Sequence, residues 1–314
     1  MTGAGVRSRS LRLGTRRSRL AMAQSGGVAA ALAADQARDV ELIEVTTYGD
    51  NSTEPLAQIG GTGVFVSALR EAVLRGEVDF AVHSYKDLPT GPASGLALAA
   101  VPPRSDPRDV LVSRDGATLA ELPPGSRVAT GSPRRVAQLR ALGLGLELVG
   151  VRGNVDTRLA KLAAGEFDAL VLARAGLQRL DRLDAVSEVL DPLQMLSAPG
   201  QGALAVECRE DDTELLELLA LLDDPDSRVA TAAERALLAG LSAGCSAPVG
   251  GLAFVAEGDE GMELYLRGSV TAIDGSDAVR LSATGSVTGA EEVGRRLADD
   301  LLANGAAELM GARE

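Results

Sequence analysis

An internal repeat is the feature that most constrains the fold of this chain. Residues 67–82, S-A-L-R-E-A-V-L-R-G-E-V-D-F-A-V, resemble residues 157–172, T-R-L-A-K-L-A-A-G-E-F-D-A-L-V-L. In each copy a helical pattern is followed by Gly-Glu, an apolar residue and Asp, and then by an apolar strand pattern. This order is typical of the αβ half of a parallel crossover unit. The repeat therefore predicts two similar α/β lobes.

Two irregular segments divide the chain between these lobes. The Pro-rich segment 101–109 predicts a first crossing, and M-L-S-A-P-G-Q-G at 195–202 predicts a second. The strand pattern that follows, at 203–208, is expected to return to the first lobe, because the second lobe already has its strands. We therefore predict domain 1 over residues 1–102 with 203–222, and domain 2 over residues 108–197.

The C-terminal part of the chain has a different character. Three β-type runs precede a helical pattern, at 251–256, 262–271, 278–285 and 290–303. Short strands joined by turns and followed by a helix indicate a small α+β domain, which we predict over residues 223–314. It opens with a helix over 226–238, with Asp226 as its N-cap. The predicted fold class is α/β, with two lobes like those of periplasmic binding proteins and a small C-terminal α+β domain.

Composition excludes several classes of partner. A formal net charge of −13 and an aromatic content of 2% argue against a surface for nucleic acid or an anionic membrane. The two cysteines, Cys208 and Cys245, are too few for a disulfide framework, so we expect a reducing cytoplasm. Arg16-Arg17 resembles a twin-arginine signal, but the segment after it lacks a clean apolar core. We expect a monomer that binds no metal.

Arginines gather at two predicted helix starts. In V-A-T-G-S-P-R-R, Pro133 suits a first helical position and Arg134 and Arg135 fall in the first turn, where the helix dipole opposes them. Arg152 and Arg158 repeat the arrangement one βα unit later. We interpret both as sites for an anionic ligand lying between the guanidinium groups. The alternative is that these arginines lie on an ordinary solvated surface, because nearly all basic residues of this chain are arginines.

A second polar segment, S-Y-K-D-L-P-T, follows the strand pattern 78–83. Open α/β sheets place ligand sites at the carboxyl ends of their strands, so Lys86 and Asp87 are candidates. Lys86 is notable because the only other lysine is Lys161. The alternative is a surface ion pair of small energetic value. His83, the only histidine, is more simply a structural hydrogen-bonding residue.

Two loops carry further candidates. The glycines and small polar residues of 48–63 fit a long loop that is either a lid or plain surface. In L-S-A-G-C-S-A-P-V-G, Cys245 lies between small residues, where its sulfur can be reached as a nucleophile or an attachment point, or has no role. Cys208 lies inside a strand pattern and is expected to be buried.

Taken in order along the chain, several motifs resemble those of the porphobilinogen deaminase (hydroxymethylbilane synthase) family: A-V-H-S-Y-K-D-L-P, A-T-G-S-P-R-R, R-G-N-V-D-T-R-L, A-P-G-Q-G-A-L-A-V-E-C-R and A-G-C-S-A-P-V-G. The resemblance covers essentially the whole chain. It implies three domains, and a transferase that joins four porphobilinogen molecules into a linear tetrapyrrole with release of ammonia. It also implies a dipyrromethane cofactor bound through a thioether to Cys245.

The resemblance also implies roles for individual residues. Asp87 matches the catalytic carboxylate, which would stabilise a developing cation and pass a proton to the leaving amine, while Lys86 beside it would help to keep it ionised. Residues implied to bind the cofactor are Cys245, Ser84, Lys86, Asp87, Thr130, Ser132, Arg134, Arg135, Arg152 and Gly153. Residues implied to bind the substrate are Arg16, Ser18, Gln24, Arg152, Arg158 and Gln201.

The chain departs from the family pattern in two places. Gln58 and Thr62 stand where many relatives have lysines, which puts a cationic lid contact in doubt, and Gly131 and Pro133 replace a Ser and a Leu. Two other functions are compatible with the residues. One is a non-catalytic bilobal binding protein for a carboxylate or oxyanion, and the other is an enzyme with Cys245 as nucleophile and His83 as base. An adduct on Cys245 would favour the transferase over both.

Overall fold

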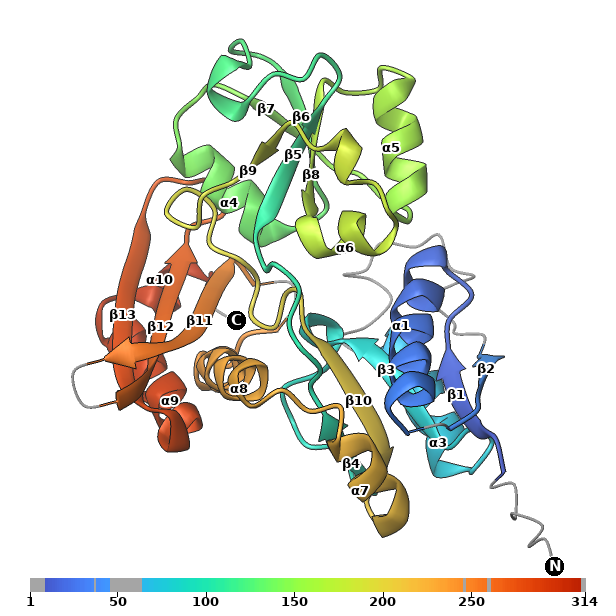
Figure 1. Ribbon diagram of the computed structural model, residues 1–314. Coiled ribbons are helices and arrows are strands. Elements are labelled where there is room, and N and C mark those ends of the chain that lie inside the picture. Colours follow the sequence, from blue (N-terminus) through green and yellow to red (C-terminus); the bar gives the residue numbers. More distant parts are fainter. Residues whose placement is uncertain (1–8, 37, 46–63, 245–246, 259–260, 312–314) are drawn as a thin grey trace, which may run out of the picture. The chain divides into compact units, whose positions relative to one another are not determined.

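A computed structural model describes residues 9–36, 38–45, 64–244, 247–258 and 261–311 (Figure 1). The chain forms two compact units. The first unit comprises residues 1–83, 93–101 and 204–223, and the second comprises 84–92, 102–203 and 224–314. Within the described ranges, no helix is both long and apolar enough to cross a membrane.

The first unit is built on a five-stranded sheet in the order β2-β1-β3-β10-β4. Its elements are β1 (Leu11–Thr15), α1 (Arg19–Gln36), β2 (Val40–Glu44), α3 (Val64–Leu74), β3 (Phe80–Ser84), β4 (Leu96–Ala100), β10 (Leu204–Arg209) and α7 (Thr213–Ala220). Strand β1 pairs in parallel with both β2 and β3, and β10 pairs antiparallel with β4. The predicted return of the chain through β10 to this sheet is therefore confirmed.

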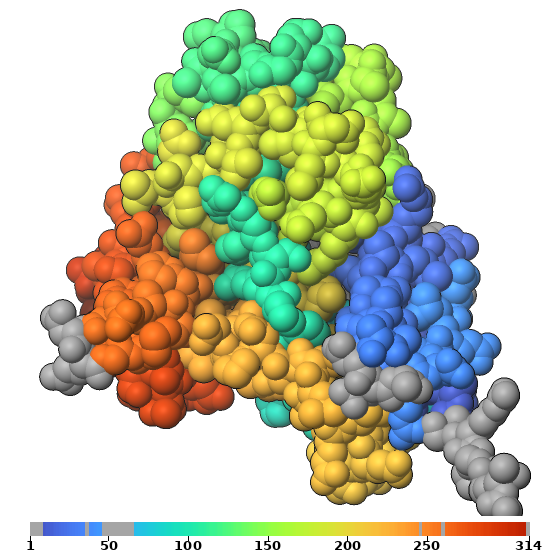
Figure 2. Space-filling model, in the orientation of Figure 1, coloured from blue at the N-terminus to red at the C-terminus, as the bar shows by residue number. Residues whose placement is uncertain are grey.

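The second unit contains a second five-stranded sheet, in the order β7-β6-β8-β5-β9. Its elements are β5 (Asp109–Ser113), β6 (Arg127–Ala129), α4 (Pro133–Ala141), β7 (Glu147–Val149), α5 (Val155–Ala163), β8 (Ala169–Ala173), α6 (Arg174–Arg179) and β9 (Glu188–Val189). Strand β6 pairs in parallel with β7 and β8, and β5 pairs antiparallel with β8. The part of the chain that follows α6, yellow in Figure 2, forms the near surface of this lobe.

The internal repeat predicts the common core of the two sheets correctly. The first copy becomes α3 and β3, and the second becomes α5 and β8. In both sheets the three strands joined by helices have the same spatial order, β2-β1-β3 in the first and β7-β6-β8 in the second. The strand that comes first along the chain lies in the middle of the three, and the strand derived from the repeat lies beside it. Apolar residues of the repeat strands are fully buried, such as Phe80 in β3 and Leu170 in β8. The α/β lobes therefore share one folding pattern.

The C-terminal part of the second unit contains an antiparallel sheet in the order β11-β12-β13, covered by helices (Figure 1). Its elements are α8 (Pro225–Gly240), β11 (Val249–Gly258), β12 (Gly261–Thr271), β13 (Ala278–Ser286), α9 (Ala290–Ala303) and α10 (Ala306–Leu309). Leu237, Leu264 and Leu297 meet in one buried cluster between the helices and the sheet. The predicted α+β character is confirmed. The division of the chain into three domains remains a prediction.

Capping residues set where two of the helices begin. Helix α1 begins at Arg19, because Ser18 caps it: its Oγ accepts the Ala21 N–H at 3.3 Å. Helix α8 is capped by Asp224, whose carboxylate accepts the Ser227 N–H at 2.8 Å, and Asp226 lies in the first turn. The predicted cap at Asp226 was therefore wrong by two residues. Pro225 explains the shift, because its fixed φ suits the first helical position and leaves Asp224 as the residue before the helix.

Candidate active site

The segment that carries Lys86 and Asp87 is held rigidly within the second unit. Strand β3 ends at Ser84, and the next three residues form the short helix η1 (Tyr85–Asp87). The Tyr85 N–H donates to the Ala203 carbonyl at 3.0 Å. Arg235 of α8 lies over the Tyr85 ring, 4.5 Å from its centroid, and donates to the carbonyl oxygens of Tyr85 and Leu88 at 3.3 and 3.1 Å. These contacts fix the backbone from which both side chains project.

Lys86 and Asp87 differ in their surroundings. Asp87 is exposed, whereas Lys86 is half-buried and its Nζ donates to Gln201 Oε1 at 3.1 Å. Loss of solvent around the ammonium group lowers the pKa of Lys86 to about 8. The carboxylates of Asp87 and Asp109 oppose this shift, and the guanidinium groups of Arg135 and Arg134 add to it. Lys86 therefore changes its charge closer to neutral pH than an ordinary lysine does.

Arg134 and Arg135 surround a carboxylate that belongs to the protein. Arg134 Nη2 lies 2.7 Å from Asp109 Oδ2, and Arg135 Nη2 lies 2.7 Å from Asp109 Oδ1. All three side chains are buried, with Asp109 at 0% exposure. Burial raises the pKa of Asp109, but the two arginines outweigh it and hold this pKa well below its ordinary value. The sequence predicted an external anion between these arginines; Asp109 occupies the place between their Nη2 atoms, and a role of their remaining N–H groups in cofactor binding stays a prediction.

The turn before α4 is organised by Thr130 and Ser132. Ser132 is the N-cap residue of α4, and Pro133 takes the first helical position as predicted. The Ser132 N–H donates to Thr130 Oγ1 at 3.3 Å, and the Thr130 N–H donates to the Val149 carbonyl at 3.0 Å. The Thr130 hydroxyl thus shapes the strand-to-helix turn that presents the two arginines.

The second predicted helix start brings Arg152, Gly153 and Arg158 together. Asn154 caps α5 by accepting the Thr157 N–H at 2.8 Å, and Arg158 Nε donates to the Gly153 carbonyl at 2.8 Å. Burial lowers the pKa of Arg158, and the positive charges of Arg135 and Arg152 lower it further. Three guanidinium groups from two helix starts therefore lie close enough to repel one another. Such a cluster favours an anionic ligand.

The donors in this part of the second unit fit a group that carries carboxylates. The Nε atoms of Arg134 and Arg135 are buried and have no hydrogen-bond partner among the residues that the structure describes. A buried N–H without an acceptor costs about 1–3 kcal/mol. Together with the cationic groups of Lys86, Arg152 and Arg158, they form a donor set that matches the acetate and propionate groups of a dipyrromethane.

Three predicted substrate residues belong to the first unit. Arg16, Ser18 and Gln24 lie at the carboxyl end of β1 and in the start of α1. Gln24 is buried, and Arg16 and Ser18 are half-buried. Their position at a strand end agrees with a ligand-binding role in an α/β sheet. The predicted attachment residue Cys245 and the loop residues Gln58 and Thr62 lie outside the described residues.

Sequence reasoning missed the acidic residues that organise the site. Asp109 was not singled out, although two buried arginines need a carboxylate nearby. Glu234 was also missed: it is fully buried and accepts from Arg104, from the Gly200 N–H at 2.6 Å and from the Ala253 N–H at 2.7 Å. Neither residue stands in a recognisable motif. The usable signal was the excess of arginines around these positions.

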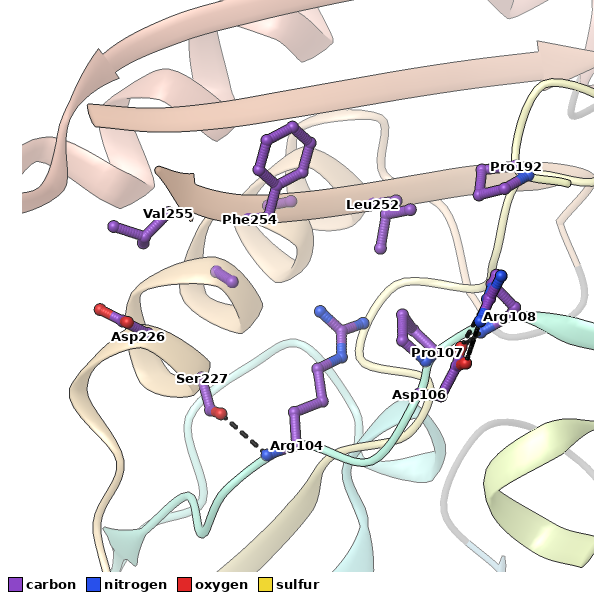
Figure 3. Close-up of a pocket in the computed structure, with 12 residues that line it drawn as sticks. Arg104, Asp106, Pro107, Arg108, Pro192, Asp226, Ser227, Leu252, Phe254 and Val255 are labelled. Atoms are coloured by element: carbon purple, nitrogen blue, oxygen red, sulfur yellow. Dashed lines mark hydrogen bonds and ion pairs between the residues drawn. The ribbon is translucent and has the colours of Figure 1, made fainter. Parts of the chain in front are cut away.

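A pocket of about 490 Å³ lies elsewhere in the second unit and contains none of the predicted site residues (Figure 3). The apolar side chains of Leu252, Phe254 and Val255 line one side of it. Both arginines that line it are paired with carboxylates: Arg108 Nη2 lies 2.6 Å from Asp106 Oδ2, and Arg104 Nη1 lies 2.7 Å from Glu234 Oε1. This pocket is therefore not the predicted cation cluster. Within the described residues, no group of three metal-ligating side chains comes together.

Comparison with known proteins decides the family. Residues 11–217 match the family model described as porphobilinogen deaminase, dipyromethane cofactor binding domain, and residues 228–303 match the porphobilinogen deaminase C-terminal domain. The chain belongs to the porphobilinogen deaminase family. Porphobilinogen deaminase 1 of Streptomyces coelicolor is 58% identical, with 97% of this chain and 98% of the relative covered. Porphobilinogen deaminase of Nocardia farcinica is 56% identical, with 98% and 90% covered.

Membership of the porphobilinogen deaminase family makes the chain a tetrapyrrole-polymerising transferase with a dipyrromethane cofactor, as the motifs predicted. The alternative of a non-catalytic binding protein is not favoured. Among solved structures, the methionine binding protein MetQ is similar, with a TM-score of 0.42 at 16% identity over 68% of this chain and 89% of that one. The VFT2 domain of Bordetella pertussis BvgS has a TM-score of 0.40 at 18% identity, over 67% and 85%.

Proposed function

We propose that this enzyme joins four porphobilinogen molecules into hydroxymethylbilane with Asp87 as its catalytic carboxylate. We also propose that it acts as a cytoplasmic monomer, which its acidic composition and its low cysteine content support. The observation that carries the assignment of the site is an exposed carboxylate on a rigid turn, next to a half-buried lysine and close to clustered arginines.

Asp87 has the exposure that a group acting on successive substrates needs. When ammonia leaves porphobilinogen, positive charge develops on the pyrrole, and a carboxylate held in place stabilises it. The same carboxylate accepts hydrogen bonds from pyrrole N–H groups. It takes up the α-carbon proton that is released when each new C–C bond forms, and it passes a proton to the amine that leaves as ammonia. Because the turn of η1 is fixed by Arg235 and by the Ala203 carbonyl, the carboxylate needs little reorganisation during the reaction.

The cationic side chains bind the carboxylates that accumulate as the product grows. Arg135, Arg152 and Arg158 bind acetate and propionate groups, and Lys86 binds a carboxylate of the ring next to Asp87. The cofactor carried by Cys245 supplies, when bound, the pyrrole carbon from which the tetrapyrrole is extended. The repulsion among the guanidinium groups is relieved when anionic groups lie between them.

Replacement of Asp87 by Asn tests this assignment. We expect Asp87→Asn to remain folded, to keep the mass of the Cys245 adduct, and to lose about 100-fold or more in turnover, because proton transfer and charge stabilisation are both removed. Porphobilinogen consumption measures turnover, and intact-protein mass spectrometry measures the adduct. Asp115→Asn is the matched control, because Asp115 is an exposed turn residue outside the cluster. Near-normal turnover of Asp87→Asn would remove this residue from the mechanism.

A further inference from the structure

The side-chain amide of Gln201 is held in one orientation. Its Nε2 donates to the Pro107 carbonyl at 2.7 Å and to Asp109 Oδ1 at 2.8 Å. Both partners only accept hydrogen bonds, so the NH₂ end must face them and the amide oxygen must face the opposite way. That oxygen accepts from Lys86 Nζ at 3.1 Å. Gln201 is 1% exposed, and its three polar contacts are therefore shielded from water.

The backbone around Gln201 is fixed as well. Gly200 has a φ of +76°, and a Cβ added there would lie 3.2 Å from the backbone nitrogen of Lys86. Gly202 has a φ of +88°, and a Cβ there would collide with the Ser105 carbonyl oxygen. Both positions favour glycine for its left-handed conformation and for the close approach of another backbone. The loop thus lies directly against the turn that carries Lys86.

Further hydrogen bonds that do not involve Lys86 hold this loop. Arg104 Nε donates to the Gln201 carbonyl at 2.8 Å, and its two Nη atoms bind Glu234 at 2.7 and 2.9 Å. The Arg104 N–H donates to the Ser227 hydroxyl at 2.9 Å, which Figure 3 shows. Because Glu234 also accepts the Gly200 N–H, the loop has contacts on both sides of Gln201. Its position does not depend on the Lys86 contact alone.

Asp109 connects this arrangement to the arginines. The oxygen that accepts from Gln201 Nε2 also binds Arg135, and the other oxygen binds Arg134. One buried carboxylate therefore determines the positions of two guanidinium groups and, through an amide, of the Lys86 ammonium group. Exchange of that carboxylate for a neutral amide would add donors where only acceptors fit, and the Gln201 amide could then reverse.

We propose that Asp109 and Gln201 are positioning residues for the polymerisation reaction. Asp109 orients the Gln201 amide so that its oxygen holds the protonated amine of Lys86 beside Asp87. The same carboxylate aligns Arg134 and Arg135. This inference rests on the proposed roles of Lys86 and Asp87, and it assigns Gln201 to Lys86 where the family resemblance suggested direct contact with substrate.

Gln201→Met tests the proposal with a titration of Lys86 in the holoenzyme. Methionine has a similar size and apolar character but offers no strong acceptor, so the charged amine loses a hydrogen bond. We expect the pKa of Lys86 to fall by about 1 or more, and turnover to fall with little change in KM. Because Lys86 and Lys161 are the only lysines, protein made with ¹³C-labelled lysine gives two Cε signals, and Lys161 serves as an internal reference.

Gln138→Met is the matched control. Gln138 is also buried, at 2% exposure, and its amide makes two hydrogen bonds, both to the backbone of Leu196. The same substitution there creates a comparable loss of buried hydrogen bonds without touching Lys86. We expect Gln138→Met to lower stability and leave the Lys86 titration unchanged. Gln201→Ala provides a second route if Gln201→Met does not fold, and we expect it to shift the titration in the same direction.

The outcomes distinguish failure of the positioning role of Gln201 from failure of the proposed function. An unchanged Lys86 titration in Gln201→Met, or an equal change in Gln138→Met, would overturn the positioning role. Failure of the proposed function has a different signature, because Lys86→Gln would then retain normal turnover while the Gln201→Met titration still moved.

Discussion

The buried cluster of Asp109, Arg134 and Arg135 makes a quantitative prediction about stability. Replacement of Asp109 by Asn leaves two guanidinium groups buried without their carboxylate. Breaking a buried ion pair by removal of one partner costs about 3–5 kcal/mol, because the remaining charge is desolvated and unpaired. Both arginines are at most 6% exposed, so water cannot replace the lost partner. We expect Asp109→Asn to lower the free energy of unfolding by an amount in this range.

The exposed pair of Asp168 and Arg114 is the control. Its Oδ1–Nη2 distance is 2.7 Å, the same as in the buried pairs, but the two side chains are 36% and 43% exposed. Exposed pairs contribute about 0–1 kcal/mol, so Asp168→Asn should have a small effect. Urea unfolding followed by circular dichroism measures both variants. Equal effects of the two substitutions would refute the argument that burial makes the Asp109 cluster costly to break.

The pH dependence of the same measurement gives an internal check. Because the pKa of Asp109 is depressed in the folded state, its contribution is present above its unfolded pKa of about 3.9 and is lost as the pH falls below it. The difference in the free energy of unfolding between the wild-type protein and Asp109→Asn should therefore become smaller in acid. A difference that stays constant down to pH 3 would show that the carboxylate charge is not its source.

Two further predictions concern other charged groups. In the first unit, the pKa of Glu207 is lowered to about 2. Burial raises this pKa, but the hydrogen bonds and charges of His83 and Arg70 lower it by more. Its stabilisation, about 3 kcal/mol, is therefore present above its ordinary pKa of 4.5 and lost as the pH falls toward 2. Glu207→Gln should reduce the slope of the free energy of unfolding against pH between pH 4.5 and 2, and a slope equal to that of the wild-type protein would contradict this. In the second unit, Arg158→Met should raise the KM for porphobilinogen about 10-fold without loss of stability, because it removes a carboxylate-binding group and relieves repulsion with Arg135 and Arg152. A KM equal to that of the wild-type enzyme would exclude Arg158 from substrate binding.

The sequence predicted the features that depend on local patterns. Helical and strand periodicity, repeated in two copies, was sufficient for the two α/β lobes and for the return of β10 to the first sheet. The Pro133 helix start was also predictable, because the first helical position tolerates a residue without an N–H. Their position after a strand pattern made Lys86 and Asp87 candidates, and the family motifs added their roles; both residues lie on η1 at the end of β3.

The sequence did not predict the partners that lie far apart along the chain. Asp109 binds arginines of α4 and the amide of Gln201, and these contacts exist only after β5, α4 and the second crossing pack together. A pattern of residue types cannot distinguish an arginine that faces a ligand from one that faces a buried carboxylate. The Arg235 contact with Tyr85 was missed for the same reason. The candidate site residues were therefore easier to predict than the buried contacts that position them.

The central claim is that Asp87 extends a tetrapyrrole chain tethered at Cys245. Intact-protein mass spectrometry after brief exposure to porphobilinogen tests it most directly. We expect an adduct in both the wild-type enzyme and Asp87→Asn, with further mass added in pyrrole-sized steps only in the wild-type enzyme. An unmodified Cys245 thiol in the wild-type protein, or the same stepwise growth in Asp87→Asn, would contradict it.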